Sequence, residues 1–417
     1  MPASADRTDG FCHTSLPGGV ELAIDPLPQR QTVALCVRLL SGAVDDPPEL
    51  GGISGIVERT MSKGTSRYDG QALADAFDAL GASWSSATGR QSTLVRVLCL
   101  PEFTSAALDL VAEMLCRPKF DDKACEVAVQ LGIEELKHMQ DDPSDLLRLD
   151  IQRLTLGPEF GRDPAGEIAS LERITSEAVR SHWRRAYQAG RLQVAVAGPV
   201  DSGALAGQVD ELFRTLGSGK RTGREPADFS FTPAVNHRQK DLKQQYIGIT
   251  LPGAAKGAAD FAAEQMLIAV LAGGMSGRLF TEVREKQGLV YWVGAWHEQP
   301  RGKGIIHLGA STTPERCEQT YRTLLRELER LAEDLSDEEI ERARNGILAH
   351  AQTEDDLTRA RAGGLSDDLF HFSKPIGLPA KLEPIRRITA DQVRDYAVRL
   401  PHDRICVATV GPQAPAI

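Results

Sequence analysis

The sequence predicts an α+β fold built from two similar domains, each a mostly antiparallel sheet packed with helices. Segments with the hydrophobic periodicity of strands alternate with segments that have the periodicity of helices, and this succession occurs twice along the chain. Hairpin-like strand pairs and neighbouring helix pairs are typical of such a fold and not of a doubly wound parallel sheet. The 417 residues exceed one ordinary hydrophobic core and favour two or three domains.

The first half of the sequence contains apolar runs of strand length separated by amphipathic segments. The run "QTVALCVRLLSG" has the composition of a buried strand, whereas "DKACEVAVQLGIEELKHMQ" repeats apolar residues at helical spacing. Asp121 and Asp122 are suitable N-cap residues for that helix. We expect strands at 31–42, 93–100 and 192–200, and helices at 70–82, 103–115 and 122–140.

The second half repeats this succession. The segment "AADFAAEQMLIAVLAGG" reads as a helix that ends in glycine, and two apolar runs after it have the length and alternation of a hairpin. Two long amphipathic helices follow, and the last apolar run is again a strand. We expect strands at 244–253, 288–299, 304–312 and 404–412, and helices at 258–274, 314–335 and 336–352.

The two halves share a pattern that indicates an internal duplication. Pro101 and Pro314 each open a helix directly after a strand, and "FDDKACEVAVQ" parallels "LSDEEIERARN". Between the halves lies a polar segment rich in Gly, Pro and basic residues, which is the composition of a linker. We therefore predict an N-terminal domain at 1–217, a linker at 218–235 and a C-terminal domain at 236–417.

Composition and charge narrow the function classes. The net charge of −10 argues against nucleic acid as the main partner, and no apolar run has the length of a membrane span. The amino end lacks the features of a secretory signal, and seven scattered cysteines without a CxxC pair fit a reducing compartment. We expect a cytoplasmic protein without a membrane partner, with a periplasmic location left open. The glycine-rich "AGGMSG" lacks the spacing of a nucleotide-binding loop.

Three motifs place the chain beside a known family. They are "GISGIVERTMSKGT" (52–65), "LGIEELKHMQDDP" (131–143) and "AGGMSGRLFTEVREKQGLVYWVGAW" (272–296). With them the chain resembles the M16 (inverzincin) metallopeptidase family, which includes mitochondrial processing peptidase, pitrilysin and insulin-degrading enzyme. The resemblance covers nearly the full length and implies the LuxS/MPP-like metallohydrolase fold, with two α+β domains of similar structure.

The zinc motif of that family is degenerate in this sequence. In active members a helix carries His-x-x-Glu-His, in which the histidines bind zinc and the glutamate is the general base. Aligned on the Lys-Gly-Thr turn, this chain has Gly55, Glu58 and Arg59 at those positions, and Glu135 at the position of the distal ligand. Because catalytic zinc needs imidazole or thiolate ligands in addition to carboxylate, we expect no metal in this chain.

Arg59 allows two interpretations. Its guanidinium could occupy the place of the metal and hold Glu135 in a bidentate ion pair. Alternatively, Glu58, Arg59 and Glu135 are ordinary solvated charges on two helix surfaces, because a buried Arg–Glu pair is costly unless its geometry is good.

The third motif keeps the functional residues of the family, whereas the first motif lacks the histidines that bind zinc. In active members of the family the corresponding segment supplies an arginine and a tyrosine that act on the substrate at the zinc, and the resemblance places these roles on Arg284 and Tyr291. A phenol stabilises the oxyanion of peptide hydrolysis, and a guanidinium holds a carbonyl or carboxylate. The alternative is structural, with a helix-terminal arginine and a tyrosine on an ordinary strand.

The resemblance implies a function that needs two chains. The family includes dimers in which one subunit carries His-x-x-Glu-His and the other the Arg/Tyr pair. We expect this chain to be the non-zinc subunit of such an M16B peptidase, with a zinc-bearing partner and peptides as substrates. The edge strand near 81–97 is expected to bind extended peptide by strand addition. The alternative is an inert structural or peptide-binding subunit, as the core subunits of the cytochrome bc1 complex are.

Overall fold

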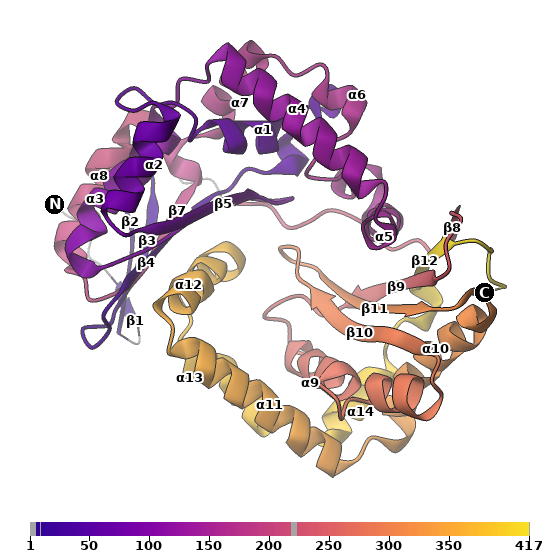
Figure 1. The fold of residues 1–417 in the computed structure, drawn as a ribbon. Helices are drawn as coiled ribbons and strands as arrows, with labels where there is room; N and C mark the ends of the chain where they lie inside the picture. Colours follow the sequence, from indigo (N-terminus) through magenta and orange to yellow (C-terminus); the bar gives the residue numbers. More distant parts are fainter. Residues whose placement is uncertain (1–5, 9, 218–222, 417) are drawn as a thin grey trace. The chain divides into compact units, whose positions relative to one another are not determined.

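The computed structural model describes residues 6–8, 10–217 and 223–416, which form two compact α+β units (Figure 1). Unit 1 comprises the described residues of Met1–Lys137, Arg162–Glu225 and Glu354–Gly377. Unit 2 comprises His138–Gly161, the residues from Pro226 to Thr353, and the described residues of Leu378–Ile417. Residues 218–222 of the expected linker lie outside the described part of the chain.

The sheet of unit 1 is mostly antiparallel. Its strand order is β1-β2-β3-β7-β4-β6-β5, and only the pairing of β3 with β7 is parallel among these described strands. The strands are β1 (Asp6–Thr8), β2 (Phe11–Ser15), β3 (Glu21–Pro26), β4 (Val33–Leu39), β5 (Ser83–Thr88), β6 (Thr93–Cys99) and β7 (Leu192–Gly198). Its helices are α1 (Ile53–Thr60), α2 (Gly70–Ala79), α3 (Thr104–Cys116), α4 (Asp122–Met139), α6 (Ile168–Leu171), α7 (Ser176–Ala186), α8 (Ser202–Phe213) and α12 (Thr358–Phe372).

The sheet of unit 2 repeats the central part of this topology. Its order is β10-β11-β9-β12-β8, antiparallel except for the pairing of β12 with β8. The strands are β8 (Ala234–Gln239), β9 (Gln245–Gly253), β10 (Val290–Glu298), β11 (Gly304–Thr312) and β12 (Cys406–Gly411). The helices are α5 (Pro143–Phe160), α9 (Phe261–Ala272), α10 (Cys317–Asp334), α11 (Asp337–Asp355), α13 (Leu378–Arg387), α14 (Ala390–Val398) and a π-helix (Leu279–Lys286).

These elements confirm the predicted α+β class with two sheets. Every segment expected as a strand or helix forms that element, with ends that differ by a few residues. The order and directions of β5-β6-β4-β7-β3 are matched by β10-β11-β9-β12-β8. This shared topology supports the internal duplication that the sequence pattern indicates.

The two units exchange helices along the sequence. Helix α5 follows α4 in the chain but packs on β12 and β9 of unit 2, whereas α12 lies in the second half of the chain and packs on β3, β4 and β7 of unit 1. Each compact unit is therefore assembled from three separate segments of the sequence. The division into domains at 1–217 and 236–417 follows the order of the sequence and stays a prediction. Part of the expected linker belongs to unit 2, where Phe229 is buried and stacks near Phe160.

Helices cover apolar faces of both sheets. In unit 1 small and medium side chains of the central strands meet Ala362, Leu365 and Leu369 of α12 in one cluster. In unit 2 Ile151 of α5 packs on Cys406 and Ala408 of β12. The opposite face of the second sheet packs on α9 and α10, and α14 packs on these two helices. The strands β4, β7 and β12 are consequently buried along their whole length.

Polar contacts fix α12 on its sheet. Arg38 of β4 is buried, donates to Ser366 Oγ (3.0 Å) and Ser92 Oγ (3.1 Å), and pairs with Asp367 (2.7 Å). Its guanidinium also lies 4.7 Å from the centre of the Phe370 ring. In the second unit Arg238 of β8 donates to both carboxylate oxygens of Asp150 on α5.

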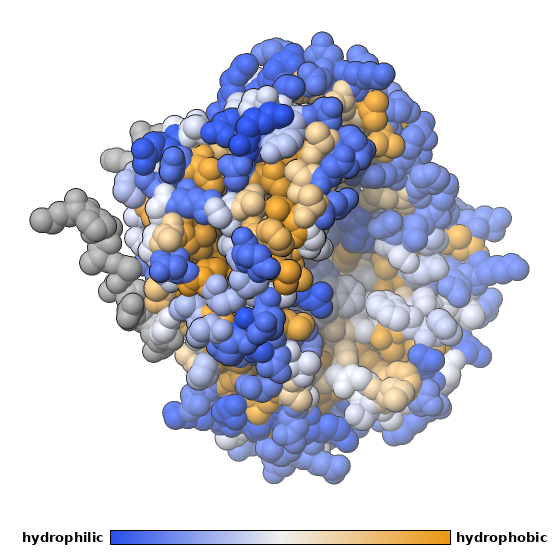
Figure 2. Space-filling model, turned by 60° about the vertical axis from the view of Figure 1, so that its left-hand side comes forward, coloured by the Kyte–Doolittle hydropathy of each residue, from blue (hydrophilic) through white to orange (hydrophobic). Residues whose placement is uncertain are grey.

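Both hydrophobic and hydrophilic residues lie on the surface. Figure 2 shows hydrophobic residues reaching the surface in several patches on the visible face, separated by hydrophilic ones. In the part of the chain that the structure describes, no helix is both long enough and apolar enough to cross a bilayer.

The contacts of Arg38 predict its contribution to stability. Replacing it in Arg38→Ala removes charge-assisted bonds to α12 and leaves buried Ser366 unsatisfied, so we expect the free energy of unfolding to fall by about 2 kcal/mol. Urea denaturation measures this change. The control Arg322→Ala removes an exposed arginine from α10 and is expected to cost less than about 0.5 kcal/mol. Equal effects of the two substitutions would show that Arg38 does not fasten α12.

Candidate functional site

Helix α1 carries three of the predicted site residues, and a buried polar network holds its amino end. Gly52 has a φ of 94°, and an added Cβ there would come within 2.8 Å of the Ala165 carbonyl oxygen, so the chain enters the helix only with glycine at this position. Asp46 accepts hydrogen bonds from the backbone N–H groups of Gly52 (2.8 Å) and Ser54 (3.2 Å). Its carboxylate thereby caps the first turn of α1.

His182 of α7 completes this network. Arg185 donates to its Nδ1 (3.0 Å), so Nε2 carries the proton and donates to Ser54 Oγ (3.0 Å). The Ser54 hydroxyl in turn donates to Asp46 Oδ1 (2.5 Å). Serine, histidine and aspartate are thus in contact, but the serine proton points to the carboxylate. The arrangement stabilises the helix and does not activate a nucleophile.

Arg59 and Glu135 form the bidentate pair of the first interpretation. The guanidinium of Arg59 on α1 donates to both carboxylate oxygens of Glu135 on α4, with Nη1–Oε1 at 2.8 Å and Nη2–Oε2 at 2.5 Å. The side chains are 35% and 56% exposed, so solvent also reaches them, as the second interpretation expects. The hydrogen bonds from Arg59 lower the pKa of Glu135 below its ordinary value.

These residues do not fit a zinc ion. Gly55 has no side chain, and Arg59 donates to the two oxygens with which Glu135 would otherwise bind a metal. In residues 6–8, 10–217 and 223–416, no group of three or more His, Cys, Asp or Glu side chains is arranged to hold a metal ion. Because an arginine keeps its proton, the pair cannot become a metal site by deprotonation.

Glu58, the residue at the general-base position, faces a cleft in unit 1. Burial raises the pKa of its carboxyl group, although the Ser86 hydroxyl of β5 donates to it and acts in the opposite direction. The cleft has a volume of about 620 Å³. Its lining includes the polar Glu58, Arg59 and Ser86 and, from α4, the apolar side chains of Ala124, Val127, Ala128 and Leu131. Strand β5 lies at the edge of the sheet, as the sequence predicted for this region.

Arg284 and Tyr291 lie together in unit 2. Arg284 belongs to the π-helix Leu279–Lys286, and its guanidinium carbon is 4.9 Å from the centre of the Phe280 ring and 5.5 Å from that of Tyr291. The register of β10 against β11 shifts between Val290 and Trp292, which leaves Tyr291 as the extra residue of a bulge. Tyr291 is 79% exposed, so its hydroxyl is accessible to a bound molecule.

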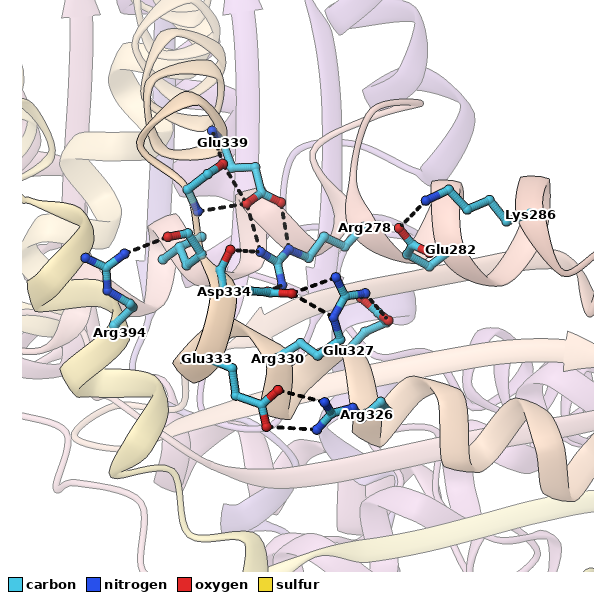
Figure 3. A network of polar contacts seen from close by, with 12 residues as sticks. Arg278, Glu282, Lys286, Arg326, Glu327, Arg330, Glu333, Asp334, Glu339 and Arg394 are labelled. Atoms are coloured by element: carbon cyan, nitrogen blue, oxygen red, sulfur yellow. Dashed lines mark hydrogen bonds and ion pairs between the residues drawn. The ribbon is translucent and has the colours of Figure 1, made fainter.

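An ionic network fixes the start of this π-helix. Arg278 donates to Glu339 (Nε–Oε1 2.7 Å, Nη2–Oε2 2.8 Å) and to Asp334 Oδ1 (2.7 Å), residues at the junction of α10 and α11. Figure 3 shows Arg278 pointing between these two carboxylates, with Arg330 joined to the other side of Asp334. Arg278 is itself buried. The position of the segment that carries Arg284 therefore depends on α10 and α11.

The structure thus joins the predicted residues in two groups, one in each unit. Glu58, Arg59 and Glu135 form the first group, and Arg284 and Tyr291 form the second. Sequence reasoning missed the supporting residues Asp46, Ser54, Ser86, His182 and Arg278. Two of them stand within the motifs of the sequence, Ser54 in "GISGIVERTMSKGT" and Arg278 in "AGGMSGRLFTEVREKQGLVYWVGAW", whereas Asp46, Ser86 and His182 stand in no recognisable motif.

Comparisons with known proteins identify the family. Residues 21–157 match the model of the insulinase family, peptidase family M16, and residues 173–347 match that of the peptidase M16 inactive domain. The chain belongs to the M16 peptidase family. The matches cover both units, and the M16 chain thus has the fold class that its motifs implied.

Relatives and solved structures are similar to this chain over nearly its whole length. The M16 chain is 26% identical to an uncharacterized zinc protease of Rickettsia felis, with 97% of this chain and 98% of the relative covered. It is 24% identical to one of Bacillus subtilis, with 94% and 96% covered. A crystal structure of a peptidase M16 inactive domain from Pseudomonas fluorescens has a TM-score of 0.89 at 20% identity, covering 97% of this chain and 98% of that one. A protease from Helicobacter pylori has a TM-score of 0.89 at 16% identity, covering 96% and 99%.

The geometry of α1 predicts that a zinc site can be rebuilt. A Cβ added to Gly55 meets only the Pro164 carbonyl oxygen at 3.7 Å, so a histidine fits there. In Gly55→His/Arg59→His two imidazoles one helical turn apart join Glu135, and we expect stoichiometric zinc binding at micromolar concentrations. Competition with a chromophoric chelator measures it.

The matched controls are wild type, Arg59→His alone, and the double variant with Glu135→Gln added. Each lacks at least one of the three ligands, so each is expected to bind zinc much more weakly. A double variant that binds zinc no better than wild type would show that α1 and α4 do not have the spacing of a zinc site.

The buried His182 predicts a dependence of stability on pH. Burial lowers the pKa of His182 to about 4, so between pH 6.5 and 4 the unfolded chain binds a proton that the folded chain does not. This term makes the protein less stable as the pH falls, by up to about 2 kcal/mol between pH 7 and 5. Asp46 acts in the opposite direction, because burial raises its pKa to about 6.

The variant His182→Gln isolates the histidine term, since Asp46 is present in both proteins. Urea denaturation at pH 7 and pH 5 is expected to show a smaller loss of stability on acidification in the variant than in wild type. An identical loss in the two proteins would exclude His182 as the titrating group.

Proposed function

We propose that this chain is the non-zinc subunit of a two-chain M16 peptidase. The observation that carries the proposal is a contrast within the chain. Arg59 bonds both oxygens of Glu135 at the degenerate zinc motif, whereas the half-buried Arg284 lies beside Tyr291, which is exposed to solvent. Without a metal site in the same chain, Arg284 and Tyr291 can act only on a substrate that is bound at the zinc of another chain. We infer that a partner chain with His-x-x-Glu-His binds the zinc and supplies the attacking water.

The chemistry of the pair suits peptide hydrolysis. Attack of water on a peptide carbonyl places negative charge on its oxygen, and the exposed hydroxyl of Tyr291 can donate a hydrogen bond to that oxygen. Arg284 presents a planar fork of donors that can hold a neighbouring carbonyl or carboxylate of the peptide. Phe280 and Tyr291 stack near the guanidinium and restrict its orientation before substrate arrives. Arg278 positions the helix and does not touch substrate.

One observation favours a second function, that of an inert peptide-binding or structural subunit. The Arg59–Glu135 pair closes the zinc position of this chain, and an assembly subunit needs no further chemistry. The amphipathic cleft beside Glu58 and the edge strand β5 would then only bind peptide. The two functions differ in what Arg284 and Tyr291 do.

Hydrolysis of a quenched peptide library tests the proposal. This chain alone, a co-expressed His-x-x-Glu-His partner alone, and their mixture are compared. We expect activity only in the mixture, and a loss of about a hundredfold in Arg284→Ala and in Tyr291→Phe, the effect of removing one oxyanion donor.

Matched controls are Lys286→Ala, which removes an exposed cation from the same π-helix, and Tyr246→Phe, which removes a phenol hydroxyl elsewhere in unit 2. Both are expected to leave the activity of the mixture unchanged. A fully active partner alone, or active-site variants that hydrolyse peptide as fast as wild type, would identify this chain as a scaffold.

A further inference from the structure

Beyond Arg284 and Tyr291, strand β10 exposes two tryptophans. Trp292 is 48% exposed and Trp296 43%, although indoles are among the side chains that gain most from burial. Their ring centres are 6.2 Å apart. The intervening Val293 and Ala295 point to the other face and pack on the core of unit 2. We call the exposed face formed by Trp292, Trp296 and the underlying His307 and Gly309 of β11 the indole ledge.

The rings of the indole ledge are held in place by the sheet beneath them. Trp296 stacks on the buried His307 of β11, with ring centres 5.1 Å apart and planes inclined by 7°. Both indoles lie over Gly309, where an added Cβ would come within 3.0 Å of Trp292 and 3.2 Å of Trp296. A side chain at 309 would lift the rings off the strand. The glycine therefore leaves room for the edges of both rings, whose planes are inclined by 49° to each other, and both indoles remain partly exposed to solvent.

The negative charge beside the indole ledge favours a cation as the group that binds there. A carboxylate oxygen of Glu298, at the end of β10, lies 3.2 Å from Nε2 of His307, directly beside the stacked Trp296. The chain as a whole carries a net charge of −10, which attracts cations. Indole faces bind guanidinium and ammonium groups more strongly than other aromatic rings do. Arg284 already stacks on Phe280 and Tyr291 at the opposite end of the strand.

We propose that the indole ledge binds the side chain of an arginine or lysine residue in a peptide substrate. The cation would lie on the faces of Trp292 and Trp296, with its charge toward Glu298. The inference rests on the proposed function, because it names the peptides that the Arg284–Tyr291 site receives. An apolar side chain or a second copy of this chain would use the ring faces without the carboxylate, and the test separates these occupants.

Fluorescence anisotropy of labelled peptides tests the indole ledge without a partner chain. Three peptides of one sequence carry Arg, its neutral isostere citrulline, or Leu at the centre, and each is titrated with wild-type chain at low ionic strength. We expect the Arg peptide to bind roughly fivefold more tightly than the citrulline peptide. Trp292→Leu and Trp296→Leu are expected to abolish this preference. Glu298→Gln is expected to reduce it and to weaken its dependence on salt.

The control Val398→Ala changes an exposed apolar residue on α14 and is expected to keep the preference of wild type. Trp292→Phe retains an aromatic face and is expected to keep part of it. Thermal denaturation shows whether each variant is folded, and a folded tryptophan variant that still prefers Arg contradicts the proposal.

Three results on wild type would also overturn the inference. They are equal binding of the Arg and citrulline peptides, tighter binding of the Leu peptide, and binding of none of the three, including the case in which self-association detected by light scattering covers the ledge. The binding assay does not depend on hydrolysis. A mixture of subunits that fails to cleave peptides would therefore refute the proposed function without affecting the measured preference for Arg. Conversely, if hydrolysis depends on Arg284 but the chain does not prefer the Arg peptide, only the proposal for the indole ledge is refuted.

Discussion

The central strands of both sheets must be buried on two faces, and this requirement governs the arrangement of the whole chain. Strands β4, β7 and β12 carry apolar side chains on both sides, so one layer of helices cannot shield them. Helices α12 and α5 cover the second faces, and each comes from the opposite half of the sequence. Neither half contains all the helices of its own compact unit, and neither is expected to fold well without the other.

An ion pair joins two helices at the degenerate zinc motif. In a zinc peptidase of this family the ion joins the helix of the motif to the helix that bears the distal ligand. Here the guanidinium of Arg59 joins α1 to Glu135 on α4 by two hydrogen bonds. The pair is partly exposed, so its desolvation cost is modest and its net contribution to stability is small. Its main consequence is geometrical, since it joins the two helices and occupies both carboxylate oxygens of Glu135.

The second site is organised differently, because its groups are presented and not paired. Arg278 is buried and saturated by carboxylates, whereas Arg284, one π-helix further on, contacts only ring faces among the interactions found for the described residues. Aromatic contacts orient a guanidinium and leave its N–H donors available. The same strand then presents Tyr291 and the indole ledge along one edge of the sheet. In the functions that we propose, this strand and its preceding helix supply a donor for an oxyanion, a clamp for a carbonyl and a surface for a basic side chain.

The order of strands and helices could be read from the sequence, because hydrophobic periodicity is local and survives in segments such as 122–140 and 304–312. The motifs likewise located Glu58, Arg59, Glu135, Arg284 and Tyr291. Helix α12 was not predicted, since its buried face includes Ser366 and Asp368, which are polar in sequence; Arg38 and the backbone N–H of Ile376 donate hydrogen bonds to them.

What the sequence by itself determined is therefore the elements with strong hydrophobic periodicity, the resemblance to the family and the candidate residues. Only the tertiary structure decided that Arg59 and Glu135 pair, that α5 and α12 change units, and that Trp292 and Trp296 stay in solvent. Each of these depends on which distant residues approach one another. The free energy of an ion pair or of a buried face is set by that approach, and residues 76 positions apart leave no periodic trace of it in the sequence.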